Sequence, residues 1–404
     1  MLSDIELMRT LVKKNDHRIV LLVLDGLGGL PMEPGGQTEL ESAVTPEMDR
    51  LASEGCLGLT IPIRYGIAPG SGPAHLALFG YDPLLHIVGR GVLEAVGVGL
   101  AVGLGDVAAR GNFCTLDSAG RIADRRAGRI PSELAAALVE RLGRLSLPSV
   151  KVDVRHVKEH RFAVVVRGDR LVPDLDDTDP QATGVPALAV VARKPEARAT
   201  ADLFNRWISA ALDELTSEPR ANGLTLRGFS TDPRLPTMES VYGVHPACVA
   251  VYPMYRGVSQ LVGMHVLDVR GDTPEDEVAA VRAAWKNHDY FFIHIKRPDS
   301  RGEDGDFAGK VEAIEAVDRA LPALLALEPA VLAITGDHST PARLRSHSWH
   351  PVPLLLWAPA TVRPDAQTVF GEAACAAGGL STFPAKDLMP LLLAHAARLD
   401  KFGA

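Results

Sequence analysis

Four short apolar runs constrain the fold of this 404-residue chain more than any other feature. They cover Ile19–Leu24, Phe291–Ile295, Val331–Thr335 and Val352–Trp357, and each has the length of a strand. A parallel strand that is covered on both faces loses the alternation of apolar and polar residues, so these runs are typical of buried parallel strands. Helical patterns lie near most of them. The chain is therefore predicted to form a doubly wound α/β sheet.

Capping residues place several of these helices. Thr45-Pro46 supplies a helix start and Gly55 a stop, and Thr273-Pro274 begins a second helix that runs to about Trp285. The stretch Phe307–Leu327 has helical spacing, and Pro322 is expected to break or kink it.

The length of the chain predicts two domains, because single cores stop growing beyond roughly 250–300 residues. Residues 106–232 have a different pattern, with candidate strands at Phe162–Val166 and Leu188–Val191 and a helix near Thr200–Leu215, for which Thr200 is the expected N-cap. We interpret this stretch as a second α/β domain inserted into a core domain made of residues 1–105 and 233–404.

Charge and cysteine usage narrow the functional class. The formal net charge is −8, which favours neither nucleic acid nor an anionic membrane as a partner. No apolar run approaches the roughly 20 residues of a membrane span, and the N-terminus lacks the apolar core of a signal peptide. The four cysteines are far apart, without a C-x-x-C pair, and fit neither a zinc knuckle nor a disulfide framework. We expect a cytoplasmic protein.

Potential metal ligands follow three of the predicted strands. Asp25 comes directly after the first strand, Asp299 follows Phe291–Ile295, and Asp337-His338 follows Val331–Thr335, with His347 nine positions after His338. Ligands of α/β sheets bind at the carboxyl ends of the strands. Mixed oxygen and nitrogen donors suit zinc or manganese. Taken singly, Asp25 also fits a capping turn residue, and the acids near Asp299 fit a loop that caps the next helix.

Ser71 is the candidate nucleophile. It stands in Pro69-Gly70-Ser71-Gly72-Pro73, a loop whose glycines and prolines fix an unusual backbone path before an apolar helix. Metal coordination activates a hydroxyl, and a helix N-terminus stabilises a phosphate attached to it. The loop alone favours a serine that merely starts a helix.

Together these motifs resemble the alkaline phosphatase superfamily, and within it the archaeal-type 2,3-bisphosphoglycerate-independent phosphoglycerate mutases. The resemblance runs nearly from end to end of the chain. The segments that carry it, besides those already named, are Gln37–Glu41, His75–Pro83, Gly89–Gly91, Asn112-Phe113, Asp124–Arg129, Glu159–Arg161, Asp177–Pro180, Thr335–Pro341 and Lys401–Ala404.

The resemblance implies a fold, a reaction and a set of site residues. The fold is an alkaline-phosphatase-like core with an inserted domain that retains the glycerate. Ser71 would take the phosphoryl group of 3-phosphoglycerate as phosphoserine and return it to give 2-phosphoglycerate, in glycolysis and gluconeogenesis, without 2,3-bisphosphoglycerate as a cofactor. One divalent metal ion would be bound by Asp25, Ser71, Asp337 and His338, and a second by Asp299, Glu303 and His347. Substrate contacts would come from Arg125, Arg129, Arg161 and Arg256.

Two positions depart from the family's pattern. The family usually has Ser-Asp-Thr-Ala-His where this chain has Ser71-Gly72-Pro73-Ala74-His75, and Glu303 replaces a metal-binding His. A carboxylate favours a harder metal, so manganese or magnesium is expected, with zinc or cobalt as alternatives. A phosphatase or another phosphotransferase of the same superfamily is the second hypothesis. A protein that binds phosphorylated metabolites without turnover is the third. The oligomeric state is left open.

Overall fold

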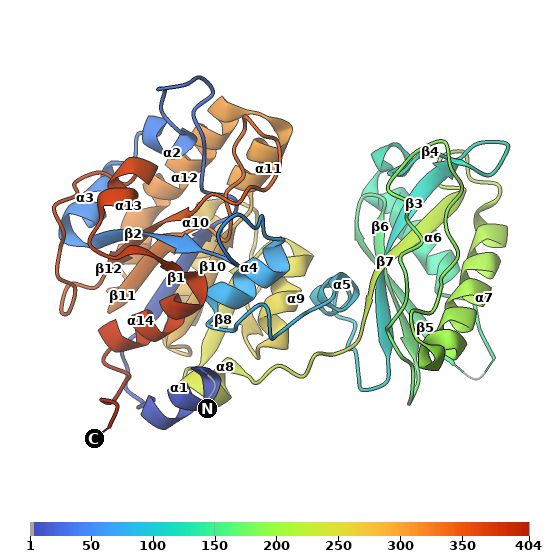
Figure 1. The fold of residues 1–404 in the computed structure, drawn as a ribbon, viewed down its shortest axis with the longest axis horizontal. Helices are drawn as coiled ribbons and strands as arrows, with labels where there is room; N and C mark the ends of the chain where they lie inside the picture. Colours follow the sequence, from blue (N-terminus) through green and yellow to red (C-terminus); the bar gives the residue numbers. More distant parts are fainter. Residues whose placement is uncertain (1–3, 149, 404) are drawn as a thin grey trace. The chain divides into compact units, whose positions relative to one another are not determined.

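The computed structural model describes residues 4–148 and 150–403, which form two compact units, residues 4–87 with 235–403 and residues 88–234 (Figure 1). Each has its own sheet and core. The chain leaves the first unit and returns to it once. Within the described residues, no helix is both long and apolar enough to cross a bilayer.

The larger unit is built on an eight-stranded sheet. Its strands lie in the order β13 (Ser381–Pro384), β2 (Cys56–Ile61), β12 (Val352–Trp357), β11 (Val331–Thr335), β1 (Ile19–Leu24), β10 (Tyr290–Ile295), β8 (Pro246–Ala250) and β9 (His265–Val266). The predicted α/β class is confirmed, and all four apolar runs are strands.

One strand differs from the prediction, because β12 runs antiparallel to both β11 and β2. The segment 336–351 between β11 and β12 contains no helix. A parallel return requires a crossover to the other end of the sheet. Without that crossover, the chain re-enters the sheet from the carboxyl end of β11.

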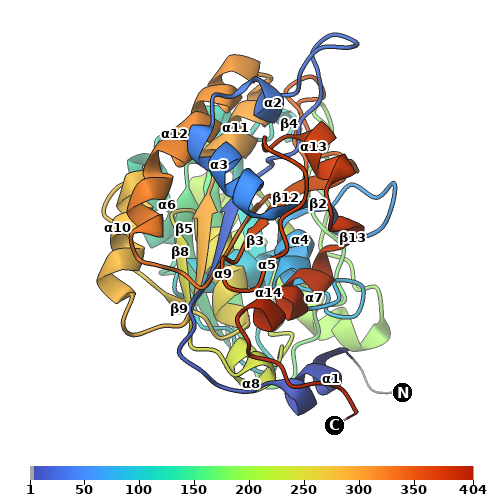
Figure 2. The same ribbon diagram turned by 90° about the vertical axis from the view of Figure 1, so that its left-hand side faces the viewer.

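Helices cover both faces of this sheet (Figure 2). The main core joins even-numbered residues of β1, such as Val20 and Leu22, to one layer of helices. That layer consists of α3 (Pro46–Glu54), α10 (Pro274–Ala284) and α12 (Phe307–Leu325). The opposite face carries α4 (Ser71–Leu78), α9 (Pro253–Leu261) and α14 (Leu388–His395). The other α-helices described in this unit are α1 (Asp4–Leu11), α2 (Glu39–Ser42), α8 (Met238–Tyr242), α11 (Arg297–Asp304) and α13 (Glu372–Ala377).

The helix boundaries agree largely with the capping signals. The helix α3 starts at Pro46 and ends before Gly55, and Thr273 closes a capping box on α10. The helix α12 continues through Pro322 to Leu325, so a break at Pro322 is wrong.

The smaller unit contains a five-stranded antiparallel sheet. Its strands are β3 (Val107–Leu116), β4 (Ile122–Asp124), β5 (Lys151–Lys158), β6 (Arg161–Arg167) and β7 (Gly223–Ser230), with β3 pairing β4, β6 and β7. Its core lies between one face of this sheet and the helices α6 (Ser132–Leu142) and α7 (Arg198–Leu215). The predicted strand at Phe162–Val166 is confirmed as part of β6.

Two predictions within this unit are wrong. Leu188–Val191 is not a strand, because its backbone bonds go to the loop at residues 176–178: Leu188 N–H donates to Thr178, and Val191 accepts from Asp176. Thr200 is not the N-cap of α7, which begins at Arg198. The Thr200 hydroxyl accepts instead from the Val172 N–H.

The unit boundaries lie at 87/88 and 234/235, whereas the sequence placed them at 105/106 and 232/233. The difference comes from α5 (Arg90–Gly97), which packs on β3 and β7 of the smaller unit. A Cβ atom on Gly91 would lie 2.4 Å from the Ala108 carbonyl and 2.7 Å from that of Gly228. Only glycine permits so close an approach.

A buried carboxyl on α10 yields the first testable prediction. Glu277 is almost fully buried, and one carboxyl oxygen has no hydrogen-bond partner among the described residues. Burial, with Asp272 and Asp276 nearby, raises its pKa from 4.5 to about 9. The unfolded chain releases this proton above about pH 4.5 and the folded chain retains it, so the free energy of unfolding falls as the pH rises between these two values.

Glu277→Gln is therefore expected to stabilise the protein by at least about 1 kcal/mol at pH 8 and to have little effect at pH 4.5. Urea denaturation at both pH values measures this difference. The matched control is Glu275→Gln, an exposed carboxylate on the same helix. Equal effects of Glu277→Gln at the two pH values would show that the carboxyl is ionised in the folded protein.

Candidate active site

The carboxyl ends of three adjacent strands place the predicted acids together. The strands β11, β1 and β10 are neighbours in the sheet, with Val23 opposite Thr335 and Leu24 opposite Ile295. Asp25 follows β1 directly, and the Asp337 carboxylate accepts a bond of 3.1 Å from the Gly26 N–H. The topology thus explains why residues more than 300 positions apart in sequence share one site.

Asp25, Asp337 and His338 form the first cluster of potential ligands. The Nε2 atom of His338 lies 3.4 Å from Asp25 Oδ1 and 3.2 Å from Asp337 Oδ2. All three side chains are completely buried. Neither Asp25 Oδ1 nor Asp337 Oδ2 has a hydrogen-bond partner among the described residues. Buried oxygens without partners are costly, and a bound cation satisfies them.

Ser71 joins this cluster from the opposite helical layer. It is the first residue of α4 rather than part of a preceding loop, and its Oγ lies 3.2 Å from His338 Nε2. His75, one turn later, has its Nδ1 2.7 Å from the Ser71 carbonyl oxygen. The structure therefore brings the predicted nucleophile to the predicted ligands.

Asp299, Glu303 and His347 lie beside the first cluster. The two acids are on α11 and not in a loop, and their four-residue spacing places them on one side of that helix. Asp299 Oδ1 is 3.6 Å from His347 Nε2, whereas Glu303 Oε1 is 4.0 Å away on a side chain that is 56% exposed. The rings of His338 and His347 stack with centroids 3.6 Å apart.

Two overlapping groups of side chains have the donor chemistry to hold a cation. Asp25, Asp337 and His338 form one group whose ligand atoms all lie within 4.8 Å of one another, and Asp299, His338 and His347 form a second. Carboxylate and imidazole donors suit manganese, zinc or, with fewer nitrogens, magnesium. His338 belongs to both groups, and Glu303 belongs to neither.

The pKa shifts in this cluster show that its buried negative charge depends on nearby positive charge. Burial, together with Asp25 and Asp299, raises the pKa of Asp337 well above its ordinary value. Burial also opposes the ionisation of Asp25, but Lys296 and His294 hold the pKa of Asp25 well below its ordinary value. Burial lowers the pKa of His338, which keeps its ring neutral and able to bind a metal.

Lys296 is a site residue that the sequence did not single out. Its Nζ lies 2.9 Å from Asp25 Oδ2 and 2.5 Å from Asp299 Oδ2, and thus bridges the two ligand groups. The hydroxyl of Tyr255 donates to Asp25 as well. The position of Lys296 directly after β10, where strand ends bind ligands, was an available signal. Tyr255, on α9, had none.

His294 is the second residue that sequence reasoning missed. It is fully buried within β10, its Nε2 lies 3.3 Å from Asp25 Oδ2, and its ring stacks on Tyr255. A histidine inside an otherwise apolar strand was the signal.

The predicted arginines are divided between the two units. Arg125, Arg129 and Arg161 lie in the smaller unit, and Arg256 is half-buried on α9 of the larger unit. Arg125 binds Asp179 through two bonds of 3.1 and 2.8 Å, so that edge of its guanidinium is already occupied. Arg129 is exposed.

Several arginines converge on His160 in the smaller unit. Burial lowers the pKa of His160 to about 3, and four guanidinium groups add to the effect. They belong to Arg161, Arg110, Arg126 and Arg129. Asn112 lies opposite Arg161 across the β3–β6 pair. This concentration of positive charge suits an anion such as a carboxylate or phosphate.

Comparisons with known proteins identify the family of this chain. A family model described as 2,3-bisphosphoglycerate-independent phosphoglycerate mutase matches residues 52–221. A probable enzyme of that name from Thermus thermophilus is 51% identical over 403 residues and 98% of each chain. One from Deinococcus radiodurans is 48% identical over 412 residues and 100% of each chain. The chain belongs to the 2,3-bisphosphoglycerate-independent phosphoglycerate mutase family.

Solved structures support membership of this mutase family. A protein from Pyrococcus horikoshii has a TM-score of 0.84 at 31% identity, over 97% of this chain and 100% of that one. The cofactor-independent phosphoglycerate mutase of Thermoplasma acidophilum has a TM-score of 0.71 at 29% identity, over 94% and 100% of the two chains. The resemblance inferred from the motifs is confirmed.

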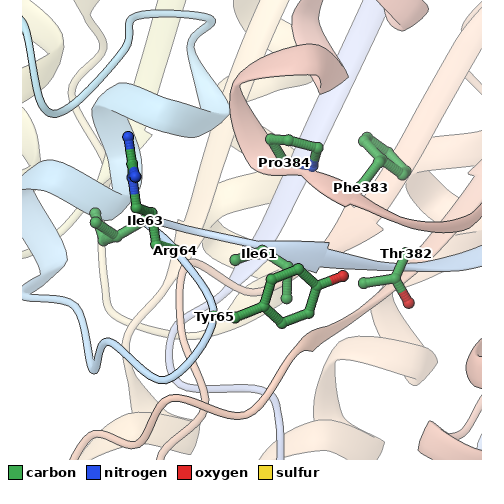
Figure 3. Close-up of a pocket in the computed structure, with 7 residues that line it drawn as sticks. All are labelled: Ile61, Ile63, Arg64, Tyr65, Thr382, Phe383 and Pro384. Carbon is green, nitrogen blue, oxygen red and sulfur yellow. The ribbon is translucent and has the colours of Figure 1, made fainter.

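A separate groove of about 440 Å³ lies at the edge of the large sheet (Figure 3). Its lining residues are Ile61, Ile63, Arg64, Tyr65, Thr382, Phe383 and Pro384. None of them is an acid, histidine or cysteine, so the groove lacks the ligand chemistry of the mutase site.

Proposed function

We propose that this chain interconverts 3-phosphoglycerate and 2-phosphoglycerate through a phosphoserine at Ser71. The observation that carries the proposal is the position of the Ser71 hydroxyl, 3.2 Å from His338 and at the edge of a buried acidic cluster. An enzyme of this family needs no phosphorylated cofactor, because the serine itself holds the phosphoryl group between its two transfers.

We infer the metal ligands from the same family resemblance. Asp25, Ser71, Asp337 and His338 would bind one divalent ion, and Asp299, Glu303 and His347 the other. Manganese or magnesium fits the predominance of carboxylates. When bound, such ions lower the pKa of the serine hydroxyl and neutralise charge on the phosphoryl oxygens. The partnerless oxygens of Asp25 and Asp337 support this assignment.

Ser71 Oγ gives up its proton and attacks the phosphorus of 3-phosphoglycerate, the bond from phosphorus to the 3-oxygen breaks, and the 3-oxygen takes up a proton to become a hydroxyl. Lys296 contributes a cation next to the transferred group, since its ammonium already lies between Asp25 and Asp299. The glycerate then turns, its 2-hydroxyl gives up a proton and attacks the phosphoserine, and the Ser71 oxygen leaves and takes up a proton. The number of phosphate esters is the same before and after the cycle.

The inserted domain retains the glycerate between the two transfers. Arg125, Arg129 and Arg161 are the proposed anion contacts there, and Arg256 contributes a phosphate contact from the larger unit. The positive charge around His160 supports this role. A cytoplasmic location fits the place of the reaction in glycolysis and gluconeogenesis, and the four unpaired cysteines are consistent with it.

An enolase-coupled assay tests the proposed function. The purified chain, loaded with manganese or magnesium, is expected to form 2-phosphoglycerate from 3-phosphoglycerate without releasing inorganic phosphate. Phosphate release without isomerisation would rule out the mutase in favour of a phosphatase, and the absence of both activities would support a binding protein.

Glu303 provides a test of the second metal position. Glu303→Gln is expected to weaken binding of one manganese ion about tenfold, since a charged ligand is replaced by a neutral amide. Isothermal titration calorimetry with manganese measures this change. Asp304→Asn is the control, on the adjacent position of α11. Unchanged affinity and stoichiometry in Glu303→Gln would show that this exposed carboxylate is not a ligand.

A further inference from the structure

Lys310 is a fully buried lysine behind the metal-binding loops. It lies on α12, and its Nζ donates to the Gly28 carbonyl at 3.0 Å and to the Thr340 carbonyl at 2.9 Å. Gly28 belongs to the loop that follows β1 and carries Asp25. Thr340 belongs to the loop that follows β11 and carries Asp337 and His338. One ammonium group therefore ties together two loops that are far apart in sequence.

Thr340 transmits this anchoring to the ligands themselves. Its hydroxyl donates to Asp299 Oδ1 at 2.7 Å and lies 2.9 Å from His338 Nδ1. Its backbone N–H lies 3.0 Å from the Gly28 carbonyl and 3.2 Å from that of Gly26. A shift of the Thr340 backbone would therefore move a ligand from each proposed metal position.

Glu39 completes the connection from the other side. Its carboxylate accepts from the Ala342 N–H at 2.7 Å and from the Leu30 N–H at 3.1 Å, and it lies 3.8 Å from Lys310 Nζ. Leu30 lies in the continuation of the loop that carries Asp25, and Ala342 lies in the continuation of the loop that carries Asp337 and His338. Both Glu39 and Lys310 have completely buried side chains.

The surrounding helix ends hold Glu39 in place. Glu39 is the first residue of α2, and Thr38 caps that helix through a capping box with Glu41. The Thr38 hydroxyl also donates to Glu372 at 2.5 Å, and Glu372 accepts from the Gly29 N–H at 2.9 Å. The sequence motif Gln37–Glu41, which the proposed chemistry does not use, thus has a physical role.

We propose that Lys310 and Glu39 are positioning residues, a buried ion pair that fixes the spacing of the Asp25 loop and the Asp337–His338 loop for metal binding. This inference rests on the proposed metal-dependent function. A buried ion pair is a poor source of stability, because desolvation offsets its attraction, but it holds its partners in a single arrangement. Metal ligands require such support, and losing a supporting partner typically costs 10–100-fold in metal affinity.

The test measures manganese affinity and thermal stability of the full chain separately. Lys310→Met is expected to weaken manganese binding at least about tenfold. It also leaves Glu39 buried without its cation, so a lower melting temperature is expected. Combining Lys310→Met with Glu39→Gln removes both charges but also one of the two acceptors for the Ala342 and Leu30 N–H groups, so this double variant should recover part of the stability while manganese binding stays weak.

Arg398→Met is the matched control. Arg398 is also fully buried, and its guanidinium binds the carbonyls of Asn15 and His17 and the carboxylate of Asp289, which directly precedes β10. This cation therefore lies at the opposite end of the sheet from the metal loops. Its loss should lower the melting temperature without changing manganese affinity.

The outcomes separate this inference from the proposed function. If the unmodified chain binds no manganese or magnesium, the metal-dependent function fails. If the unmodified chain binds manganese, and if both Lys310 variants bind manganese as tightly as the unmodified chain does, the positioning role alone is refuted. Should Lys310→Met not fold, Glu39→Gln takes its place with the same expected loss, and an unchanged affinity in that variant refutes the role as well.

Discussion

Ser71→Ala is expected to lose mutase turnover by at least about 10⁴-fold while still binding 3-phosphoglycerate. The hydroxyl is the only group at this position that can accept the phosphoryl group, and the methyl side chain of alanine leaves no acceptor. The proposed substrate contacts of the arginines are unaffected by the change. The enolase-coupled rate and calorimetric titration with 3-phosphoglycerate measure the two properties separately.

A serine outside the site provides the control for this variant. Ser53 is exposed on α3, and Ser53→Ala should keep the full rate. Substantial turnover by Ser71→Ala would refute the phosphoserine mechanism, because another group would then have to carry the phosphoryl group. Loss of 3-phosphoglycerate binding in the same variant would instead assign Ser71 to substrate recognition.

Asp337→Asn is expected to lower turnover at least about a hundredfold and to reduce bound manganese from two ions per chain to one. The carboxylate contributes one of the two partnerless oxygens of the first cluster, beside the Nε2 of His338. Asparagine has nearly the same shape but no charge. Because burial, together with Asp25 and Asp299, raises the pKa of Asp337, the metal-free variant should be at least as stable as the unmodified chain.

Metal analysis and thermal denaturation measure these properties. Asp365→Asn is the control, since the Asp365 carboxylate accepts from the backbone N–H groups of Leu57, Gln367 and Gly379, away from the site. The control should lower stability and leave the metal content at two. Two bound ions in Asp337→Asn would show that Asp337 is not a ligand.

The sequence predicted the parts of the site that follow from strand ends. Asp25, Asp299 and Asp337 each come shortly after a buried apolar run, and parallel neighbours bring such residues to one edge of a sheet. The order β11-β1-β10 was not predicted, because nothing in an apolar run specifies its neighbours. The antiparallel direction of β12 was missed for the same reason.

Residues that act through long-range packing could not be predicted. Tyr255 reaches Asp25 from α9, and Lys310 reaches Gly28 and Thr340 from α12. A tyrosine or lysine within an amphipathic helix has the same local pattern whether it faces solvent or a buried carboxylate. Arg125 shows a contact that the sequence did not suggest, since the resemblance assigned it to the substrate and the structure pairs it with Asp179.

The family resemblance supplied what local patterns left open. Taken singly, Ser71 fitted a helix start, and it is indeed the first residue of α4. Its Oγ lies 3.2 Å from His338 Nε2, which supports the proposed role of Ser71 as nucleophile. Glu303 stays a prediction, because its carboxylate is 4.0 Å from His347 and largely exposed.

Rapid quenching during turnover shows whether Ser71 carries the phosphoryl group. The manganese-loaded enzyme is mixed with 3-phosphoglycerate, quenched in acid within the first turnovers, digested and analysed by peptide mass spectrometry. A phosphate on Ser71 is expected to appear as fast as turnover and to disappear when the substrate is removed. Turnover of 3-phosphoglycerate to 2-phosphoglycerate with no phosphate on Ser71, or with phosphate on a different residue, would contradict the phosphoserine mechanism.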